Sequence, residues 1–192
     1  MSEPRNGADG PPERISSRPV YDGTIVHLAV DTVRFPDGNS GELEIIRHSG
    51  ASAVLPLLGS REDADPDILL IRQYRYATAG YLYEVPAGRP DFEGEDWDVC
   101  ARRELEEETG MIAGTLTRLT TIWTTPGFTD ELIHLFIGED LREGTIARDV
   151  DEFIELVRIP LSAALRLVES GEISDAKTVT CLLYAAAFRL RR

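Results

Sequence analysis

The 192-residue sequence has little of what marks membrane-spanning or secreted disulfide-bonded proteins. It contains no apolar run of about 18 residues, so we expect no membrane-spanning helix. Its first residues, Met1–Arg5, lack the apolar centre of a signal peptide. It has only two cysteines, Cys100 and Cys181, which both fall in segments expected to be helical. This favours buried thiols over a disulfide and fits a cytoplasmic protein.

Positive charge is also scarce, because 20 lysines and arginines face 34 aspartates and glutamates, for a formal net charge of −14. A polyanion is repelled by phosphate backbones, which argues against a nucleic-acid-binding protein. If the substrate is itself anionic, bound metal ions and a few arginines must offset the repulsion locally. The apolar fraction of 42% is enough for a full core. The length fits one catalytic domain with a small extension.

Turn signals and composition divide the chain into three regions. Residues 1–19 are polar and rich in proline and glycine, which predicts a disordered tail. Residues 20–50 are expected to form a small antiparallel β region, with strands over 21–35 and 42–48 joined by a turn. So few strands are marginal alone, so this region should pack on the main domain or on a second subunit. The main domain is expected to span 51–192.

The main domain combines strands with one early and two late helices. Apolar or alternating segments predict strands over 51–58, 68–76, 82–86, 115–124, 132–137 and 153–159. Helices are predicted over 97–109, 161–170 and 174–190, the last with Ser174 as its N-cap. An acidic, mobile loop is expected over 138–151. The order of elements indicates a mixed α/β layer fold.

The helix predicted over 97–109 has an unusual distribution of charge. At about 100° per residue, Glu104 and Glu108 fall inside the apolar stripe, whereas a solvated charge run lies opposite it. Unpaired buried carboxylates are costly, and a hard divalent cation bound through oxygen atoms would compensate them. An acidic helix end paired with Arg102 and Arg103 is the alternative, and the helix alone leaves both open.

The longer stretch around this helix favours the metal-binding interpretation, because it resembles the Nudix box, G-x5-E-x7-R-E-U-x-E-E-x-G-U with U aliphatic. The matching residues are Glu95, seven intervening residues, and then Arg103-Glu104-Leu105-Glu106-Glu107-Glu108-Thr109-Gly110-Met111. The stretch departs from the pattern once, since six residues rather than five separate Gly88 from Glu95. The extra residue should lengthen the loop without moving the helix. The resemblance implies an α/β fold, the Nudix α/β/α sandwich with a mixed sheet.

Other segments resemble the ADP-ribose pyrophosphatase subgroup of that family. They are Pro126, fifteen residues after Met111, and the runs Glu84–Gly88, Pro126–Glu131 and Ser174–Thr178. The resemblance implies hydrolysis of the diphosphate of ADP-ribose, or of a related nucleoside diphosphate sugar, to AMP and ribose 5-phosphate by water attack at phosphorus. It also implies Mg²⁺ as the cofactor, with Mn²⁺ as a substitute, and a homodimer that exchanges the N-terminal β region.

The resemblance also assigns roles to individual residues of this chain. The implied metal ligands are Glu104, Glu108 and the carbonyl of Ala87, with Glu107 bridging or joining them. Arg103 is expected to hold the glutamates in place, and Glu95 to support the loop rather than to touch metal. Arg75 is expected to reach a substrate phosphate, where its planar fork of donors suits the geometry. The remaining substrate-binding candidates are Glu84, Gly127 and Glu131.

The general base is expected in the acidic loop before the last core strand. Glu152 matches by register with the strand that begins at Phe153, and it is also a candidate metal ligand. Asp149 and Asp151 flank the same position and remain alternatives.

Two other functions stay open at this point. The first is a pyrophosphatase for GDP-mannose or another nucleotide sugar, since the sequence does not fix the base. The second is a Nudix-like domain that binds ADP-ribose and regulates a partner without cutting the ligand. Such domains usually lose glutamates of the box, whereas Glu104, Glu107 and Glu108 are all present here, which favours an enzyme.

Overall fold

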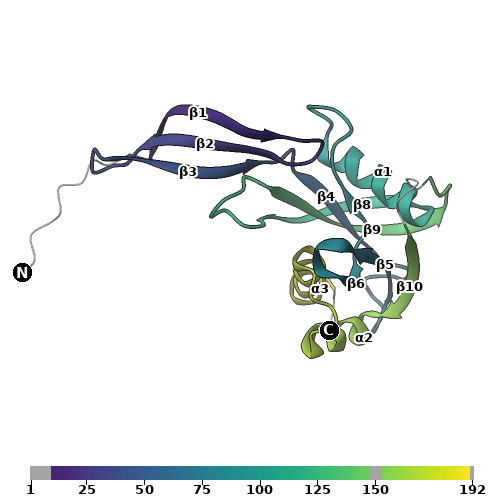
Figure 1. Cartoon of the computed structure of the whole chain (residues 1–192). Helices are drawn as coiled ribbons and strands as arrows, with labels where there is room; N and C mark the ends of the chain where they lie inside the picture. The colour runs from purple at the N-terminus through teal and green to yellow at the C-terminus, as the bar shows by residue number, and fades with distance from the viewer. Residues whose placement is uncertain (1–9, 148–152, 191–192) are drawn as a thin grey trace, which may run out of the picture. The chain divides into compact units, whose positions relative to one another are not determined.

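The computed structural model describes residues 10–147 and 153–190, and the chain divides into two compact units (Figure 1). The first unit consists of the segment up to His48 together with Trp123–Glu131, and the second of Ser49–Ile122 with the chain from Leu132 onward. The sequence had placed a boundary at residue 50, between the expected β region and the main domain. The assignment of Trp123–Glu131 to the first unit was not expected, because the sequence placed this segment in the main domain.

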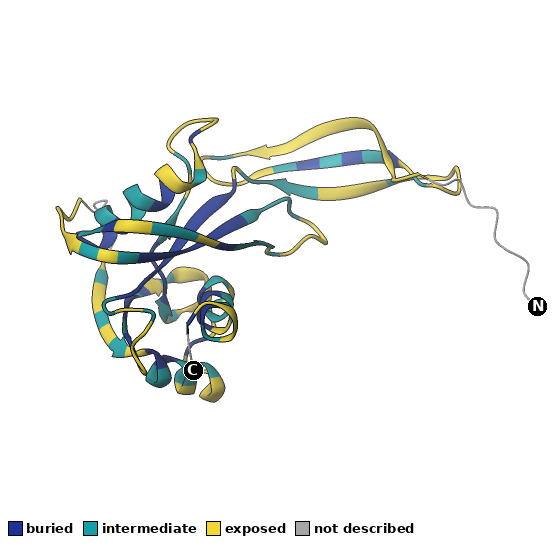
Figure 2. Cartoon of the chain, turned by 180° about the vertical axis from the view of Figure 1, so that it is seen from behind, coloured by how far each residue is buried: buried dark blue, intermediate teal, exposed yellow. Residues whose placement is uncertain are grey.

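The first unit contains a three-stranded antiparallel sheet in the order β1-β2-β3. Its strands are β1 (Glu13–Asp22), β2 (His27–Arg34) and β3 (Ser40–Arg47). Figure 2 shows that β1 is exposed along its length, whereas buried and half-buried residues alternate along β2. A sheet this small buries little apolar surface by itself, so tertiary or quaternary contacts must supply part of its stability.

Two expectations for this region were wrong. The predicted tail over 1–19 is wrong from Glu13 onward, where β1 begins, whereas residues 1–9 lie outside the described part of the chain. The single strand expected over 21–35 is two strands, and Ile25 and Val26 are exposed in the turn between them. The reason is that β1 is held by backbone pairing with β2 and buries no side chain. Without a buried face, its sequence carries no alternation that would reveal a strand.

The second unit contains two further sheets, in the orders β7-β4-β9-β8 and β10-β5-β6. In the first, β4 pairs parallel with β9 and antiparallel with β7, so this sheet is mixed, as predicted. In the second, β5 pairs antiparallel with both neighbours. The strands are β4 (Ala51–Pro56), β5 (Asp67–Arg75), β6 (Gly80–Glu84), β7 (Ala87–Gly88), β8 (Met111–Trp123), β9 (Leu132–Glu143) and β10 (Ile154–Pro160).

Three α-helices and a short 3₁₀ helix, η1 (Tyr76–Thr78), complete the described part of the chain. The helices α1 (Trp97–Thr109) and α2 (Leu161–Ser170) have the predicted bounds, whereas α3 (Ala176–Phe188) starts later than expected. Its N-cap is Asp175 and not Ser174, because the Asp175 carboxylate accepts the backbone N–H of Thr178 at 3.0 Å. No helix in the described ranges is long and apolar enough to cross a bilayer.

The mobile loop expected over 138–151 was also wrong in its first part, because β9 continues to Glu143. The acidic residues there suggested a loop, but the backbone remains hydrogen-bonded beside β8. The inner residues of this extension still pack, since Leu141 contacts the cluster of buried residues beneath α1. Residues 148–152 lie outside the described part of the chain.

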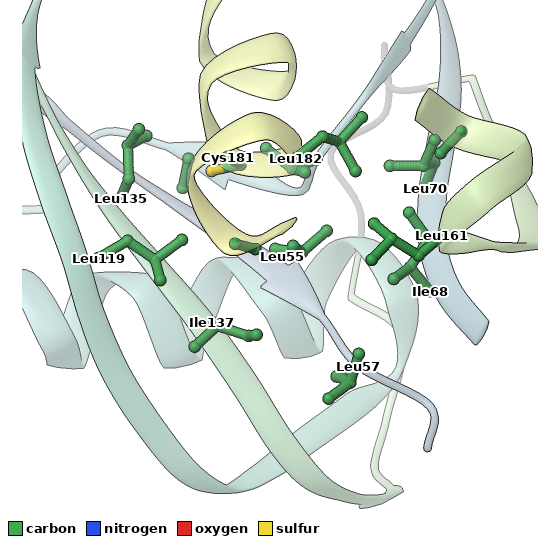
Figure 3. Close-up of a cluster of buried hydrophobic side chains, with 14 of the residues drawn as sticks. Leu55, Leu57, Ile68, Leu70, Leu119, Leu135, Ile137, Leu161, Cys181 and Leu182 are labelled. Carbon is green, nitrogen blue, oxygen red and sulfur yellow. The ribbon is translucent and has the colours of Figure 1, made fainter. Parts of the chain in front are cut away.

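The mixed sheet has apolar side chains on both faces, and this fixes the position of α1. The main core gathers Leu55 of β4 with residues of β9, α2 and α3, and Figure 3 shows these side chains converging. Val54, the residue before Leu55 in β4, points to the opposite face and packs with Ala101 and Leu105 of α1. Both cysteines are free and buried in the structure, as predicted. Helix α1 is therefore held on its own face of the sheet, by a second, smaller cluster.

Candidate active site

Helix α1 carries the acidic residues of the candidate site. It ends at Gly110, whose φ of 71° is left-handed, and the N–H of this residue donates to the carbonyl of Glu106 at 2.7 Å. A glycine adopts this conformation without strain, which explains the sharp end of the helix. Glu108 is only 3% exposed and lies with Ala101 and Leu105 on the buried face. The predicted placement of this carboxylate inside the apolar stripe is confirmed.

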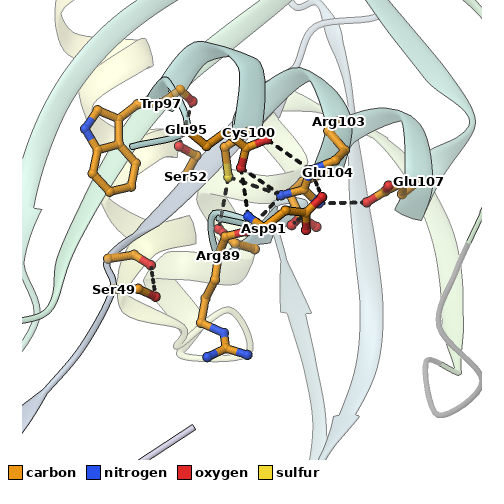
Figure 4. Close-up of polar contacts among 12 residues, drawn as sticks. Ser49, Ser52, Arg89, Asp91, Glu95, Trp97, Cys100, Arg103, Glu104 and Glu107 are labelled. Atoms are coloured by element: carbon orange, nitrogen blue, oxygen red, sulfur yellow. Dashed lines mark hydrogen bonds and ion pairs between the residues drawn. The ribbon is translucent and has the colours of Figure 1, made fainter. Parts of the chain in front are cut away.

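Arg103 is the centre of the polar contacts on α1 (Figure 4). Its Nη1 atom donates to Glu104 at 2.8 Å and to Glu107 at 2.9 Å. Its other nitrogens approach Asp91 at 3.2 Å and Glu95 at 3.3 Å. Burial would lower the pKa of Arg103, but these carboxylates raise it above its ordinary value. One guanidinium therefore contacts four carboxylates, offsets part of their repulsion and fixes the side chains of two box glutamates.

The loop before α1 is tied to the helix through the same arginine. Arg103 donates from Nη2 to the carbonyl of Arg89 at 2.8 Å, and Glu95 accepts the N–H of Asp91 at 3.0 Å. Burial would raise the pKa of Glu95, but the bonds from Arg103 and from Asp91 lower it below its ordinary value. Glu95 is therefore an ionised anchor of the loop, which is the structural role that the sequence suggested for it.

The short strand β7 brings the backbone of Ala87 and Gly88 against the box glutamates. The N–H of Ala87 donates to Glu108 Oε2 at 3.0 Å. A Cβ atom on Gly88 would lie 2.1 Å from the carboxylate of Glu104, so a larger residue here would have to displace that carboxylate. The carbonyl of Ala87, Glu104 and Glu108 thus come from two segments that are packed directly together.

The donor set of this region suits a hard divalent cation, because carboxylate and carbonyl oxygens are the ligands that Mg²⁺ prefers. Across residues 10–147 and 153–190, no three His, Cys, Asp or Glu side chains already converge as a metal site. The contacts explain this, since Glu104 and Glu107 face Arg103 and Glu108 faces the N–H of Ala87. The residues fit a metal by their chemistry, and a bound ion would compete with these partners.

A second charged cluster lies where β5, β6 and α3 meet. Glu84 is 1% exposed and binds Arg75 through both oxygens, at 2.6 Å to Nε and 2.9 Å to Nη2. It also forms an ion pair with Lys177, which contacts Asp175 at 3.1 Å. Burial would raise the pKa of Glu84, but Arg75 and Lys177 lower it below its ordinary value. Lys177 is the only lysine of the sequence.

This cluster holds Arg75 near the box glutamates. Its hydrogen bonds to Glu84 are the main reason that the pKa of Arg75 is raised, and the charge of Glu108 also contributes. The structure thus brings Arg75 and Glu84 into direct contact, although the sequence named them separately. Whether Arg75 reaches a phosphate stays a prediction.

Cys100 lies beside Gly88 and Arg103, but its thiol is not reactive. Its Sγ atom is 3.6 Å from the carbonyl of Gly88 and 3.6 Å from Arg103. Burial raises the pKa of the Cys100 thiol to about 11. A thiol that stays protonated is a poor nucleophile, so this residue packs the helix against the loop.

The other predicted site residues lie elsewhere. Gly127 and Glu131 belong to the first unit, where Glu131 accepts a hydrogen bond from the Thr124 hydroxyl at 2.7 Å. The candidates for the general base, Asp149, Asp151 and Glu152, lie outside the described residues, and so does Glu152 as a metal ligand. Their roles stay predictions.

Two residues of the site were not found from the sequence. Asp91 was given no role from the sequence, yet it contacts Arg103. Lys177 was noted only as part of a motif, and its partner Glu84 is far away in the sequence. An isolated lysine in a chain that otherwise uses arginine was the signal that could have drawn attention to it.

Comparison with known proteins gives consistent matches. A family model described as a NUDIX domain matches residues 47–180. An ADP-ribose pyrophosphatase from Bacillus subtilis is 38% identical over 172 residues, which cover 88% of this chain and 90% of the relative. A GDP-mannose pyrophosphatase from Salmonella paratyphi B is 39% identical over 156 residues, which cover 73% of this chain and 79% of the relative.

The fold is also matched by a solved structure. The crystal structure of an ADP compounds hydrolase superposes with a TM-score of 0.78 at 25% sequence identity. The match covers 92% of this chain and 93% of that chain. The layered α/β fold with its antiparallel N-terminal region is therefore an established arrangement.

Proposed function

Since the chain belongs to the Nudix hydrolase family and is a pyrophosphohydrolase of that family, we propose that its substrate is ADP-ribose or a closely related nucleoside diphosphate sugar. The products would be AMP and ribose 5-phosphate. The observation that carries the proposal is the buried carboxylate of Glu108, packed with Glu104 against the backbone of Ala87 and Gly88. The ADP-ribose pyrophosphatase among its relatives supports this substrate.

The cofactor in this proposal is Mg²⁺, for which Mn²⁺ can substitute. Glu104, Glu108 and the Ala87 carbonyl would hold it, with Glu107 as an additional ligand. When bound, such ions neutralise the oxygens of a diphosphate and lower the pKa of a bound water. The net charge of −14 makes this compensation necessary, because the substrate is also an anion.

The chain's own residues contribute positioning and charge. Arg103 keeps Glu104 and Glu107 in place through two hydrogen bonds from one nitrogen. Arg75 is oriented by Glu84 through Nε and Nη2, so its Nη1 atom would be the one to approach a phosphate oxygen. Catalysis of phosphoryl transfer depends mainly on such positioning and on electrostatic stabilisation. The buried cluster around Glu84 would therefore hold Arg75 in position to bind the substrate.

A panel of substrates tests this function. ADP-ribose, other ADP-sugars and GDP-mannose would be supplied with Mg²⁺, and the released monophosphates measured after coupling to a phosphatase. We expect ADP-ribose to have the highest kcat/KM. GDP-mannose is the second candidate, favoured by the relative that is 39% identical. Binding of ADP-ribose without turnover would instead indicate a regulatory domain and would contradict the proposal.

Hydrolysis in ¹⁸O-labelled water would locate the attacked phosphorus. Both products arise whichever phosphorus is attacked, so their identity does not distinguish the two. If the ligands from α1 and Ala87 act on the adenosyl phosphate, the label should enter AMP, as mass spectrometry would show. Label in ribose 5-phosphate would contradict that geometry.

The general base is expected to be Glu152, which lies outside the described residues. Glu152→Gln should lower kcat by about 100-fold or more while KM changes little, because a base acts only in the transition state. Its pH profile should also lose the acidic limb. If Glu152→Gln has a normal kcat, the base is instead Asp149 or Asp151. The variants Asp149→Asn and Asp151→Asn would then identify which of the two it is.

A homodimer is also part of the proposal. Apolar side chains are exposed on the first unit, namely Ile15, Val20, Tyr21, Ile25, Val26 and Leu43. Six exposed apolar residues on so small a sheet support this proposal, because contiguous apolar patches mark protein interfaces. Light scattering should give twice the chain mass of 21.3 kDa, and Val20→Glu should lower it. A fully active monomer would contradict this prediction.

The proposed location is the cytoplasm. The support is that both cysteines are free and buried, which suits a reducing compartment.

A further inference from the structure

The loop that leads into α1 encloses a cavity that none of the roles described so far uses. Its volume is about 830 Å³, and it is lined by Ser49 and residues 89–97. Pockets of about 300–1,000 Å³ hold small molecules. The loop is the one that is a residue longer than the family pattern. The cavity is thus large enough for part of a substrate.

The cavity adjoins the residues that would act on the diphosphate. Its wall includes Asp91 and Glu95, which contact Nε and Nη2 of Arg103, whereas Glu104 contacts Nη1 of the same guanidinium (Figure 4). The carbonyl of Arg89 also accepts a hydrogen bond from Arg103. With the adenosyl phosphate beside Glu104, the second phosphate of the diphosphate would carry its sugar toward the adjoining cavity.

The lining of the cavity has a distinct chemistry. Four of its residues are carboxylates, whereas Arg89 is its single cation. Two aromatic rings complete it: Phe92, which is 64% exposed, and Trp97, which stacks on His134 with ring centres 4.2 Å apart. The carboxylates are Asp91, Glu93, Glu95 and Asp96.

This chemistry favours one part of a nucleoside diphosphate sugar over the others. Carboxylates repel phosphates, and an ionised carboxylate only accepts hydrogen bonds. Adenine presents mostly acceptors on its edge, so it matches such a lining poorly. A neutral sugar presents several hydroxyl donors, which form strong charge-assisted bonds with carboxylates. Its apolar C–H face can also pack on an exposed ring such as that of Phe92.

We propose that the cavity formed by Ser49 and residues 89–97 binds the terminal sugar of the substrate and determines which sugar is accepted. This inference rests on the proposed function, because it assigns the part of a nucleoside diphosphate sugar that lies beyond the second phosphate. Phe92 provides the ring against which the sugar packs, and Glu93 accepts hydrogen bonds from its hydroxyls.

Trp97 provides a direct test, because it lines the cavity and the chain has only two tryptophans. In a Trp123→Phe variant, Trp97 is the only tryptophan that fluoresces. With Mg²⁺ present, we expect ribose 5-phosphate to cause a saturable change in its emission and AMP to cause none. A response to AMP alone would identify a nucleoside pocket, and no response to either would mean that the cavity binds no part of the substrate. Both results would overturn the proposal.

Kinetics of cavity variants provide the second test. Phe92→Ala should lower kcat/KM for ADP-ribose by about tenfold, the loss expected for one aromatic contact. For the methyl ester of ADP, which has a diphosphate but no terminal sugar, kcat/KM should stay within about twofold of the wild-type value. Glu93→Gln keeps the size of the side chain. It should also lower kcat/KM for ADP-ribose relative to kcat/KM for the methyl ester of ADP. Equal losses on both substrates would overturn the proposal.

A matched control and an independent outcome complete the design. Val99→Ala alters an exposed apolar residue of α1 that does not line the cavity, so both substrates should be unaffected. If the wild-type enzyme hydrolyses neither substrate, the proposed function fails. The fluorescence test with ribose 5-phosphate still decides the cavity in that case, because it needs no turnover.

Discussion

Glu108→Gln should reduce kcat by at least about 100-fold at saturating Mg²⁺, the scale of losses seen when metal sites are disturbed, while the protein stays folded. The reason is that Glu108 is a buried carboxylate beside Ala87 and Gly88, where a cation is needed. Glutamine can still accept the N–H of Ala87. It also removes one charge from a crowded acidic region, so the Tm without metal should stay the same or rise.

The matched control for this variant is Glu106→Gln on the same helix. Glu106 accepts the N–H of Thr145 at 3.2 Å through Oε1, and glutamine keeps that acceptor. Activity of the control should stay within about twofold of wild type, as for most surface substitutions. Near wild-type turnover of Glu108→Gln at high Mg²⁺ would show that this residue is not a metal ligand.

Glu84→Gln should lower the free energy of unfolding at pH 7 by about 3 kcal/mol, which is the cost of breaking a buried ion pair by removing one partner. Glu84 is 1% exposed and forms ion pairs with both Arg75 and Lys177. The change should lower the Tm by about 6–12 °C for a chain of this size. It should also raise KM, because Arg75 loses the carboxylate that orients it.

The effect of Glu84→Gln should depend on pH with a definite sign. The pKa of Glu84 is lower in the folded chain than its ordinary value of 4.5. The stabilisation is therefore complete above that value and is lost as the pH falls through the folded pKa. The free energies of unfolding of wild type and variant, measured in urea, should therefore differ less below about pH 4.5. A constant difference from pH 7 to pH 3 would contradict the assignment.

Glu155→Gln is the control for this second variant. Glu155 binds Arg72 at 3.1 Å in the same sheet, but its side chain is 65% exposed. Such surface pairs contribute about 0–1 kcal/mol, so this variant should change stability little at any pH. An equal loss in both variants would mean that burial of Glu84 is not the cause.

The parts of the fold that could be predicted are those that local chemistry determines. The bounds of α1 follow from its periodicity and from Gly110, and the burial of Glu108 follows from the position of this residue on the helix. Strand β4 is nearly all apolar because it is buried along its length, and in β5 the apolar run over 68–71 is the buried part. In these segments the sequence pattern and the final environment agree, so the pattern alone is informative.

The parts that could not be predicted depend on partners that are distant in sequence. Strand β1 is defined by its pairing with β2 and leaves no burial pattern. The position of Lys177 next to Glu84 exists only once α3 has packed near β6. Two adjacent residues, Ser174 and Asp175, can each cap a helix, and the choice depends on the contacts of Asp175 with Thr178 and Lys177.

The single lysine gives this protein an unusual response to amine-directed reagents. Apart from the amino terminus, Lys177 is the only target for an N-hydroxysuccinimide ester, since the other 19 basic residues are arginines. Its side chain is 11% exposed and is paired with Glu84 and Asp175. Acylation therefore requires that the start of α3 separates from β6. The rate of acylation then reports the free energy of that local opening.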